Sequence, residues 1–325
     1  MSQLAYKFKG AGHEEPERKR KYTSDIRLQE AFSKYLDNVI VDGVGERYIL
    51  ALKLTRNIKA SVEEVDALLV GYQGHRNFEQ AGFFASAIFN SIPDKKIVFD
   101  VKLEELVDGL CYELPKGKTF VNKANVGTIG FHSEGMIINE GEASEIALPK
   151  GPSINYGTID FIEVGPDVKG PAINYGNVSR IGSTTEPFSN ASLLNYGRIE
   201  LFGDDYSSLI INMGTAEHMA KGAQKSSVAI NYGKTGENFG SGAHGIVLAA
   251  KNPDSFGAKV NARLAWTQED INEVKPLKKY LEELREKLEP GRKDHNQALA
   301  VLEKYTCTNV RKDIEKIVRG AGYEI

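Results

Sequence analysis

The sequence predicts an α+β protein: a central parallel β-solenoid (β-helix) of about 6–7 coils, with helical N-terminal and C-terminal modules. Two observations predict it. The tripeptide Asn-Tyr-Gly recurs with a period of about 20 residues, which is typical of solenoids. On both sides of these repeats, apolar residues are spaced as on one face of a helix. We therefore expect a mobile arm (1–21), a helical N-terminal module (22–95), the β-solenoid (96–260) and a helical C-terminal module (261–325).

The N-terminal arm contains few apolar side chains and ends in four basic residues, Arg18 to Lys21. Such a cluster can bind phosphates or an acidic partner. Glu14, Glu15 and Glu17 neutralise most of its charge, so we interpret the arm as a solvated tail. No other segment carries a basic excess either, whereas a nucleic-acid-binding surface normally does. Nucleic acid is therefore not the expected partner, and binding through the arm is a further alternative only.

The N-terminal module is predicted to be mostly helical. Ser61-Val62-Glu63-Glu64 has the capping-box pattern that begins a helix. The apolar residues that follow lie on one helical face: Val65, Leu68, Leu69 and Tyr72. A second helix is expected to begin at Asn77 and to end at Pro93, which cannot continue a helix. Between Asp25 and Ile58 the pattern is ambiguous, and we favour a helix over a strand for Ile49–Leu54.

The repeat region runs from about Thr119 to Ser255, and an aliphatic residue always precedes the tripeptide. The copies begin at Ile154, Ile173, Leu194 and Ile230, with a Met-containing variant at Ile211. Their Asn-to-Asn steps are 19, 21, 17 and 19 residues. In each coil, one strand should end in the aliphatic–Asn pair, and a second should follow the glycine, whose tolerance of positive φ suits a tight coil. Because side chains alternate faces, Ile159, Val178 and Ile199 should point inward.

The repeated asparagine predicts an internal ladder of side-chain amides. Coils of a solenoid lie about 4.8 Å apart, so amides at one corner can bond to each other along the axis. The expected ladder residues are Asn155, Asn174, Asn195, Asn212 and Asn231. Two weaker copies of the repeat lie upstream, Asn125-Val126-Gly127 and Ile138-Asn139-Glu140-Gly141. For these asparagines we favour a structural role over ligand binding.

The repeated tyrosine is the candidate binding feature. If the aliphatic residue two places earlier points inward and the corner keeps the alternation, the tyrosines face outward as an aromatic stripe, interrupted by Met213. Its members are Tyr156, Tyr175, Tyr196 and Tyr232. Aromatic faces bind sugars and bases. In the alternative interpretation, which we favour, the rings stack on each other or under a loop and stabilise the solenoid.

Catalytic patterns are sparse. The six histidines show no metal-ligand spacing with each other or with the two cysteines, so neither a metal site nor a cofactor is expected. His218 and His244 are weak candidates for a catalytic base. Asp160, Glu200 and Glu217 occupy similar positions along their strands. Such a carboxylate row fits a glycosidase or lyase site, and it fits the solvated face of a strand better.

The composition is that of an ordinary soluble protein, with 41% hydrophobic residues, 26% charged residues and a net charge of −3. No apolar run approaches the roughly 18–20 residues that cross a bilayer, so no membrane association is expected. The N-terminus lacks the apolar stretch of a secretory signal. Cys111 and Cys307 lie far apart, which predicts free, small buried thiols in a reducing compartment. We therefore expect a cytoplasmic protein.

After Trp266 the chain is predicted to be helical again. Leu277–Leu288 is strongly amphipathic, and four leucines form its apolar face: Leu277, Leu281, Leu284 and Leu288. Terminal helices of this kind would cap the exposed edge of the last coil. The leucine face is also the best candidate for contact with a protein partner or with a second copy of the chain.

One stretch resembles a known family. Residues 233–245, Gly-Lys-Thr-Gly-Glu-Asn-Phe-Gly-Ser-Gly-Ala-His-Gly, resemble a coil of the glycine-rich solenoid at the C-terminal end of the glutamate synthase large subunit. A similar solenoid occurs in a subunit of formylmethanofuran dehydrogenase. The resemblance covers one coil clearly and implies a right-handed β-helix whose role is chiefly scaffolding. The Asn-Tyr-Gly repeat is not that family's pattern, and no cofactor residues carry over.

These observations favour a non-enzymatic scaffold or binding protein built on a β-solenoid, whose partner the sequence does not indicate. The alternative is a carbohydrate-active enzyme or transferase that uses a groove on the side of the solenoid. An enzyme requires a concave groove in which two carboxylates, or a base and an arginine, lie within hydrogen-bond reach. A scaffold is expected to show ladders and a flat, unbroken side.

Overall fold

The computed structural model describes residues 25–39, 43–164, 168, 172–182, 192–204, 209–212, 214–220, 228–231, 233–236, 239–241 and 246–249. The predictions for the mobile arm, the C-terminal helical module, Cys307 and His244 fall outside these residues. Those for Tyr232 and Met213 fall outside them as well.

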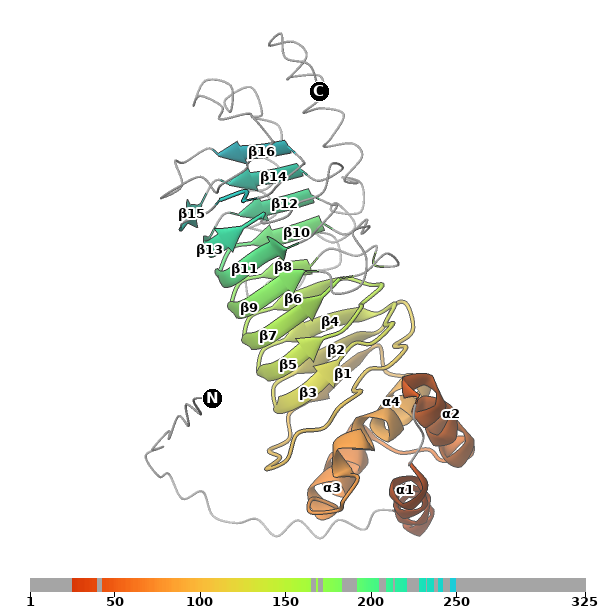
Figure 1. The fold of residues 1–325 in the computed structure, drawn as a ribbon. Coiled ribbons are helices and arrows are strands. Elements are labelled where there is room, and N and C mark those ends of the chain that lie inside the picture. Colours follow the sequence, from red (N-terminus) through yellow and green to blue (C-terminus); the bar gives the residue numbers. More distant parts are fainter. Residues whose placement is uncertain are drawn as a thin grey trace.

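A parallel β-solenoid forms the body of the protein, as predicted (Figure 1). Sheet A has nine strands in the order β1 (Lys96–Phe99), β2 (Thr119–Asn122), β4 (Met136–Asn139), β6 (Ser153–Asn155), β8 (Ala172–Asn174), β10 (Ser192–Asn195), β12 (Leu209–Asn212), β14 (Val228–Asn231) and β16 (Ile246–Ala249). Sheet B has seven strands in the order β3 (Asn125–Ile129), β5 (Glu142–Ile146), β7 (Thr158–Glu163), β9 (Asn177–Gly182), β11 (Arg198–Asp204), β13 (Thr215–Met219) and β15 (Lys234–Thr235). The expected number of coils stays a prediction, because parts of residues 96–260 lie outside the described ranges.

From β2 to β15, each coil places one strand in each sheet. For example, β6 ends at Asn155 and β7 begins at Thr158, so only a short turn separates them. Parallel pairing keeps equivalent residues aligned from coil to coil. The predicted inward residues Ile159, Val178 and Ile199 form one such column and are 0, 4 and 0% exposed, which confirms that prediction. The interior is therefore built of aliphatic columns that run along the solenoid axis.

The glycine of the repeat is required by close backbone contact and not by positive φ. A Cβ added to Gly176 would lie 2.1 Å from the carbonyl oxygen of Gly157, and one added to Gly197 would lie 2.2 Å from that of Gly176. Positive φ occurs instead at the corner glycines Gly203 and Gly240, where φ is 72° and 69°. The expectation of positive φ is thus confirmed at these corners and wrong for the glycine of the repeat.

The helical elements precede the strands: α1 (Ile26–Asn38), α2 (Val44–Thr55), α3 (Val62–Gly71), the 3-10 turn η1 (Phe78–Gln80) and α4 (Ala81–Ser91). Ile49–Leu54 lies within α2, so the helix favoured there is confirmed. The capping box of α3 is confirmed too. The Ser61 hydroxyl accepts from the Glu64 amide at 3.3 Å, and the Glu64 carboxylate accepts from the Ser61 amide at 2.8 Å.

The helix expected from Asn77 starts differently from the prediction. The 3-10 turn η1 comes first, and α4 follows it directly and ends before Pro93. Asn77 makes no side-chain cap bond to this helix. Its side-chain nitrogen instead donates to the Leu36 carbonyl at the end of α1, at 2.7 Å, so the side chain is held by a contact with another helix.

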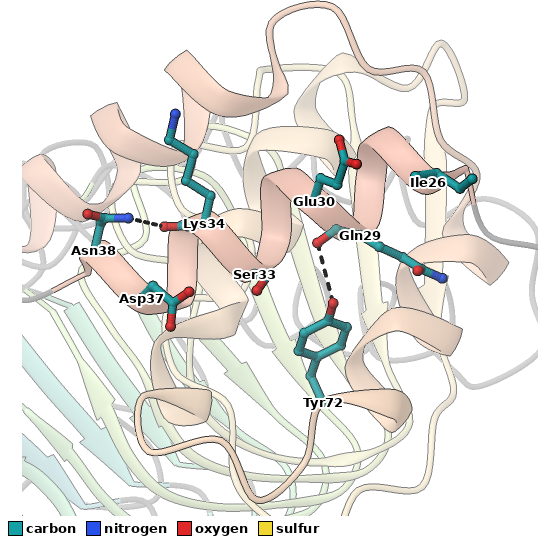
Figure 2. A pocket seen from close by; sticks show the side chains of 8 residues that line it. All are labelled: Ile26, Gln29, Glu30, Ser33, Lys34, Asp37, Asn38 and Tyr72. Carbon is teal, nitrogen blue, oxygen red and sulfur yellow. Dashed lines mark hydrogen bonds between the residues drawn. The ribbon is translucent and has the colours of Figure 1, made fainter.

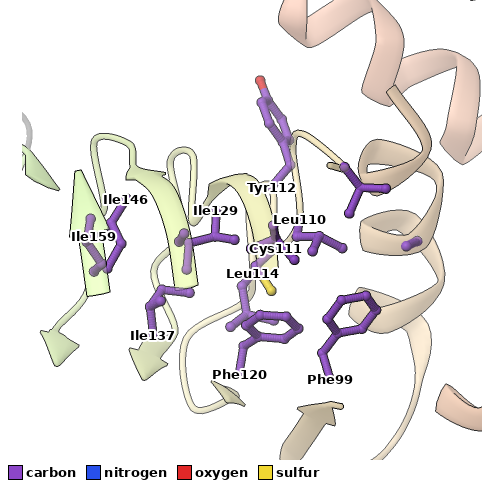
Figure 3. Close-up of a cluster of buried hydrophobic side chains, with 14 of the residues drawn as sticks. Phe99, Leu110, Cys111, Tyr112, Leu114, Phe120, Ile129, Ile137, Ile146 and Ile159 are labelled. Carbon is purple, nitrogen blue, oxygen red and sulfur yellow. The ribbon is translucent and has the colours of Figure 1, made fainter. Parts of the chain in front are cut away.

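Helix α4 closes the first coil of the solenoid (Figure 1). The buried Ser86 hydroxyl donates to the Gly109 carbonyl at 2.8 Å and accepts from the Tyr112 amide at 3.2 Å. The ring of Phe89 lies 6.3 Å from that of Phe99 and 6.0 Å from that of Phe120. Figure 3 shows how the aliphatic columns of the interior continue into this aromatic cluster. The helical module and the solenoid therefore share one hydrophobic core.

The chain before β2 also protects the first edge of sheet B. Residues 107–113 run beside β3, where the Gly127 amide donates to the Val107 carbonyl at 3.0 Å. The Gly130 amide donates to the Leu110 carbonyl at 2.8 Å. An open edge strand would offer these groups to another molecule. Lys118 adds a further tie, since its ammonium group donates to the Phe89 and Asn90 carbonyls at the end of α4, at 2.8 and 3.0 Å.

No helix within the described ranges is both long and apolar enough to cross a membrane.

Candidate functional site

The predicted asparagine ladder is present and longer than expected. Each side-chain amide donates to the side-chain oxygen of the equivalent asparagine in the next coil. These bonds measure 2.8 to 2.9 Å and join, in order, Asn122, Asn139, Asn155, Asn174, Asn195, Asn212 and Asn231. All seven residues are fully buried. The five asparagines predicted from the repeat are thus confirmed as a structural ladder.

Each ladder amide makes further bonds inside the protein. The amide of Asn155 also donates to the Gly157 carbonyl at 3.1 Å, and its side-chain oxygen accepts from the Gly157 amide at 3.1 Å. Another bond, 3.3 Å long, joins the Asn155 amide to the Asn177 carbonyl in the next coil. Through these bonds the side chain of Asn155 stabilises its own corner and links its coil to the next one.

The upstream end of the ladder corrects one interpretation of the repeat. Asn125, taken as part of a weak copy, is exposed at the start of β3. The ladder residue of that coil is Asn122, which ends β2 and is followed by Lys123 and Ala124 where later coils have tyrosine and glycine. Asn139 belongs to the ladder as the other weak copy suggests. The sequence signal that identifies Asn122 is the preceding Val121, which matches the aliphatic–Asn pair of the other coils.

The tyrosines that follow the ladder form a stack on the outside of the corner. The rings of Tyr156 and Tyr175 lie 5.2 Å apart and are inclined by 13°. Those of Tyr175 and Tyr196 lie 4.9 Å apart and are inclined by 7°. All three side chains are partly exposed. Since the ring faces cover each other, the geometry agrees with the stabilising interpretation, and a binding role for the stripe stays a prediction.

The assumption used to orient the tyrosines is wrong. Ile154, Ile173 and Leu194 precede the buried asparagines, and neighbouring residues of a strand point to opposite faces. Among the described residues, the contiguous core contains Leu193 but none of these three. The aliphatic residue of the repeat therefore lies on the outer face of sheet A, and the corner itself turns the tyrosines outward.

A polar cavity lies at the corner where β2 and β4 lead into β3 and β5. It has a volume of about 470 Å³ and is lined in part by Lys123, Glu140 and Thr158. Lys123 and Glu140 occupy the same place in their coils as the tyrosines, and their charged groups lie 3.5 Å apart. Burial, together with a smaller effect of the Glu140 carboxylate, raises the pKa of Tyr156 to about 12. This end of the corner thus combines an ion pair with a tyrosine that stays protonated.

The predicted carboxylate row lies on the outer face of sheet B. Pairing of Ile199 with Ala216 puts Glu200 and Glu217 on adjacent strands, whereas Asp160 lies two strands away from Glu200. Glu217 binds Arg198 of the neighbouring strand at 2.5 Å. This exposed ion pair fits the solvated interpretation of the row. His218 pairs with Leu201, so it lies one position away from Glu200.

A second outer column of sheet B was missed by the sequence interpretation. It contains Thr128, Glu145, Phe161 and Arg180, which pair in register. Burial raises the pKa of Glu145, and the carboxylates of Glu163 and Asp108 raise it further. The Arg180 guanidinium lies 5.2 Å from the centre of the Phe161 ring. The sequence offers one signal for Glu145, its place next to an inward-pointing isoleucine. Many surface glutamates have such a neighbour, so the signal does not single out Glu145.

A second cavity follows the outer face of α1 (Figure 2). Its volume is about 500 Å³, and its lining side chains are mostly polar: Ile26, Gln29, Glu30, Ser33, Lys34, Asp37, Asn38 and Tyr72. The Tyr72 hydroxyl donates to the Gln29 carbonyl at 3.4 Å, which ties the end of α3 to α1. We call this site the α1 groove. The sequence did not predict this groove, because Asp25–Ile58 could not be assigned to helix or strand. The groove also depends on two helices that are separate in sequence, α1 and α3.

Within the described ranges, no three histidine, cysteine, aspartate or glutamate side chains are grouped to hold a metal ion. Comparisons with protein families, with curated proteins and with solved structures found no match to this chain.

Proposed function

We propose that this protein is a non-enzymatic scaffold or binding protein built on its β-solenoid. The observation that carries this proposal is the unbroken ladder from Asn122 to Asn231, backed by the tyrosine stack. The residues that repeat most regularly, the ladder asparagines and the stacked tyrosines, thus hold the coils in register. A rod of this kind keeps distant surface points at fixed separations, which is what a scaffold requires.

Three finer proposals go with it. The solenoid has about 6–7 coils, and the C-terminal helices carry a contact with a protein partner or with a second copy. The resemblance of residues 233–245 to the glutamate synthase solenoid points to the same scaffolding role. The free thiol of Cys111 is fully buried, which is in keeping with the cytoplasmic location that the cysteine usage predicts.

The α1 groove is the surface that we assign to a partner. It is the larger of the two cavities described above, it lies on the helical module away from the ladder, and its charges are mixed. Glu30 and Asp37 contribute negative charge and Lys34 contributes positive charge. A polar peptide segment with both signs of charge would match this lining.

Affinity purification from the native organism tests the scaffold proposal. The tagged chain should retain a stoichiometric partner, and Ser33→Trp, which fills the groove, should lose it. Lys59→Trp, an exposed position just before α3, is the matched control and should retain it. Binding at this groove would be contradicted if both variants lost the partner, or if the unmodified chain itself retained none.

A second candidate function is a carbohydrate-active enzyme, and Glu145 is the observation that favours it. A carboxyl group whose pKa is raised by burial and by nearby carboxylates has the property of a general acid. The purified chain should then hydrolyse or transfer glycosidic bonds, and Glu145→Gln should abolish that turnover. Glu142→Gln, at an exposed position of the same strand, should leave it unchanged.

A further inference from the structure

Strand β1 forms the first edge of sheet A, at the end of the solenoid that carries the helices (Figure 1). It pairs with β2 on one side only. The first edge of sheet B is protected by residues 107–113, whereas no strand in the described part of the chain pairs with the other side of β1. A free edge of this kind offers its backbone amides and carbonyls to another strand.

The backbone groups on the free side of β1 belong to Lys96 and Val98. In a parallel pair, alternate residues of a strand bond to the neighbouring strand. The Lys95 and Phe99 carbonyls accept from backbone amides at the start and just after the end of β2, at 2.7 and 2.8 Å. The amides and carbonyls of Lys96 and Val98 therefore point away from β2, and no residue of the described ranges bonds to them on that side.

The side chains of this segment alternate between buried and exposed, and the alternation extends past both ends of β1. Ile97, Phe99 and Val101 lie in the hydrophobic core. The alternate residues are exposed: Asp94, Lys96, Val98, Asp100 and Lys102. We call these five residues the edge set. Its central member, Val98, is 37% exposed although both of its neighbours are fully buried.

The edge set is complementary in charge to itself. Counted outward from Val98, the first residues on either side are Lys96 and Asp100, and the next are Asp94 and Lys102. If two copies pair antiparallel around Val98, Lys96 therefore lies opposite Asp100 of the second copy. Asp94 likewise lies opposite Lys102 of the second copy. Opposite charges directly across two antiparallel strands are favourable, whereas like charges are unfavourable.

Other arrangements of two β1 strands bring like charges together. A shift by two residues in one direction puts Asp94 opposite Asp100, and a shift in the other direction puts Lys96 opposite Lys102. Parallel pairing in register puts each charge beside its own copy. A shift by one residue sets exposed side chains opposite buried ones. The antiparallel arrangement around Val98 is thus the one that the charges select.

We propose that β1 pairs with β1 of a second copy of this chain, antiparallel and around a two-fold axis at Val98. The backbone groups of Lys96 and Val98 then gain partners, and the two Val98 side chains lie opposite each other. Sheet A continues from one chain into the other, and the two rods extend in opposite directions. Because a two-fold contact uses the edge of both copies, it closes at a dimer. This contact is separate from the α1 groove.

Sedimentation velocity of the full chain at several concentrations tests the contact. The wild type should form a concentration-dependent dimer, and Val98→Pro should raise the dissociation constant about tenfold or more. Proline lacks the amide that faces the second copy, while the pairing of β1 with β2 does not use this amide. Val98→Thr keeps the amide and the branched side chain, so it is the matched control and should retain the dimer.

A charge exchange separates this contact from a general effect on folding. Lys96→Asp sets aspartates opposite each other, and Asp100→Lys sets lysines opposite each other, so each variant alone should be monomeric. An equimolar mixture of the two variants should form a heterodimer, because every pair across the two strands then joins opposite charges. Lys53→Asp, an equal charge change at an exposed position of α2, should dimerise like the wild type.

Three results would overturn the proposal. One is a wild-type chain that stays monomeric at the highest concentration. Another is a dimer that persists in Val98→Pro and in both single charge variants, because the contact would then lie elsewhere. The third is a mixture of the two folded charge variants that forms no heterodimer. Circular dichroism shows that each variant is folded, and if Val98→Pro fails to fold, the charge exchange decides.

Discussion

The side-chain amide of Asn155 donates a 2.9 Å hydrogen bond to the side-chain oxygen of Asn174, the equivalent residue of the next coil. The same bond recurs along the solenoid with almost unchanged length. Both residues are fully buried, so neither can exchange this partner for water. Loss of the partner of a buried amide therefore lowers the free energy of unfolding, so the ladder is the first feature to test.

Asn195→Leu should destabilise the protein. It removes the acceptor of the Asn174 amide and the donor to the Asn212 oxygen, which leaves two buried polar groups short of a bond. The expected loss is about 1–3 kcal/mol in the free energy of unfolding, measured by thermal or denaturant melting. Asn177→Leu, the same change at an exposed strand position, should have little effect. Wild-type melting of Asn195→Leu would contradict the ladder.

Gly176→Ala should be more harmful than an ordinary glycine change. The new Cβ would lie 2.1 Å from the Gly157 carbonyl oxygen, and this backbone cannot move without separating the coils. We expect a loss of about 1–3 kcal/mol or more in the free energy of unfolding, or failure to fold. The control is Gly71→Ala at the end of α3, where nothing lies within 4 Å of the added Cβ. Equal melting temperatures for the two variants would refute the close-contact argument.

Tyr175→Leu should weaken the solenoid by removing both of its ring contacts. Each stacked pair contributes about 0.5–1.5 kcal/mol beyond simple burial. Tyr175→Phe keeps the ring between Tyr156 and Tyr196, so it should lose less stability than Tyr175→Leu. Differential scanning calorimetry of the two variants measures the difference. If both variants melt alike, the stack does not stabilise the coils.

Stability should fall as the pH rises from about 4 to about 7 because of Asp66. Burial, together with smaller effects of the Glu63 and Asp100 carboxylates, raises the pKa of this carboxyl to about 7. One of its oxygens is buried and makes no hydrogen bond in the described part of the chain. The folded protein thus keeps the proton in a pH range where the unfolded chain has lost it, so protonation favours the fold at low pH.

Asp66→Asn should remove this pH dependence. The variant carries no ionisable group there, so its melting temperature between pH 4 and 8 should lack the decline that the wild type shows. Asp160→Asn, an exposed position on β7, should keep the wild-type profile. A wild-type profile in Asp66→Asn would mean that other groups cause the dependence.

Local pattern was sufficient for much of this fold. The aliphatic–Asn pair and its spacing identified five strands of sheet A, which are β6, β8, β10, β12 and β14, and the capping box at Ser61 identified the start of α3. Both signals depend on residues close in sequence. The α1 groove and the raised pKa of Glu145 could not be predicted, because each depends on side chains from separate elements. Asn77 shows the same limit, since its side-chain nitrogen donates to the Leu36 carbonyl of α1, a contact that the local pattern does not indicate.

The sequence by itself determined that the chain forms a stacked solenoid with an asparagine at the same corner of successive repeats. It also determined that Ile154 and Asn155 point to opposite faces, because side chains alternate along a strand. Only the tertiary structure decided which face is the inside. Alternation relates neighbours to each other, and both faces of sheet A carry apolar residues. The closure of the coil puts Asn155 inside and leaves Ile154 on the other face of sheet A, where it is buried but outside the contiguous core.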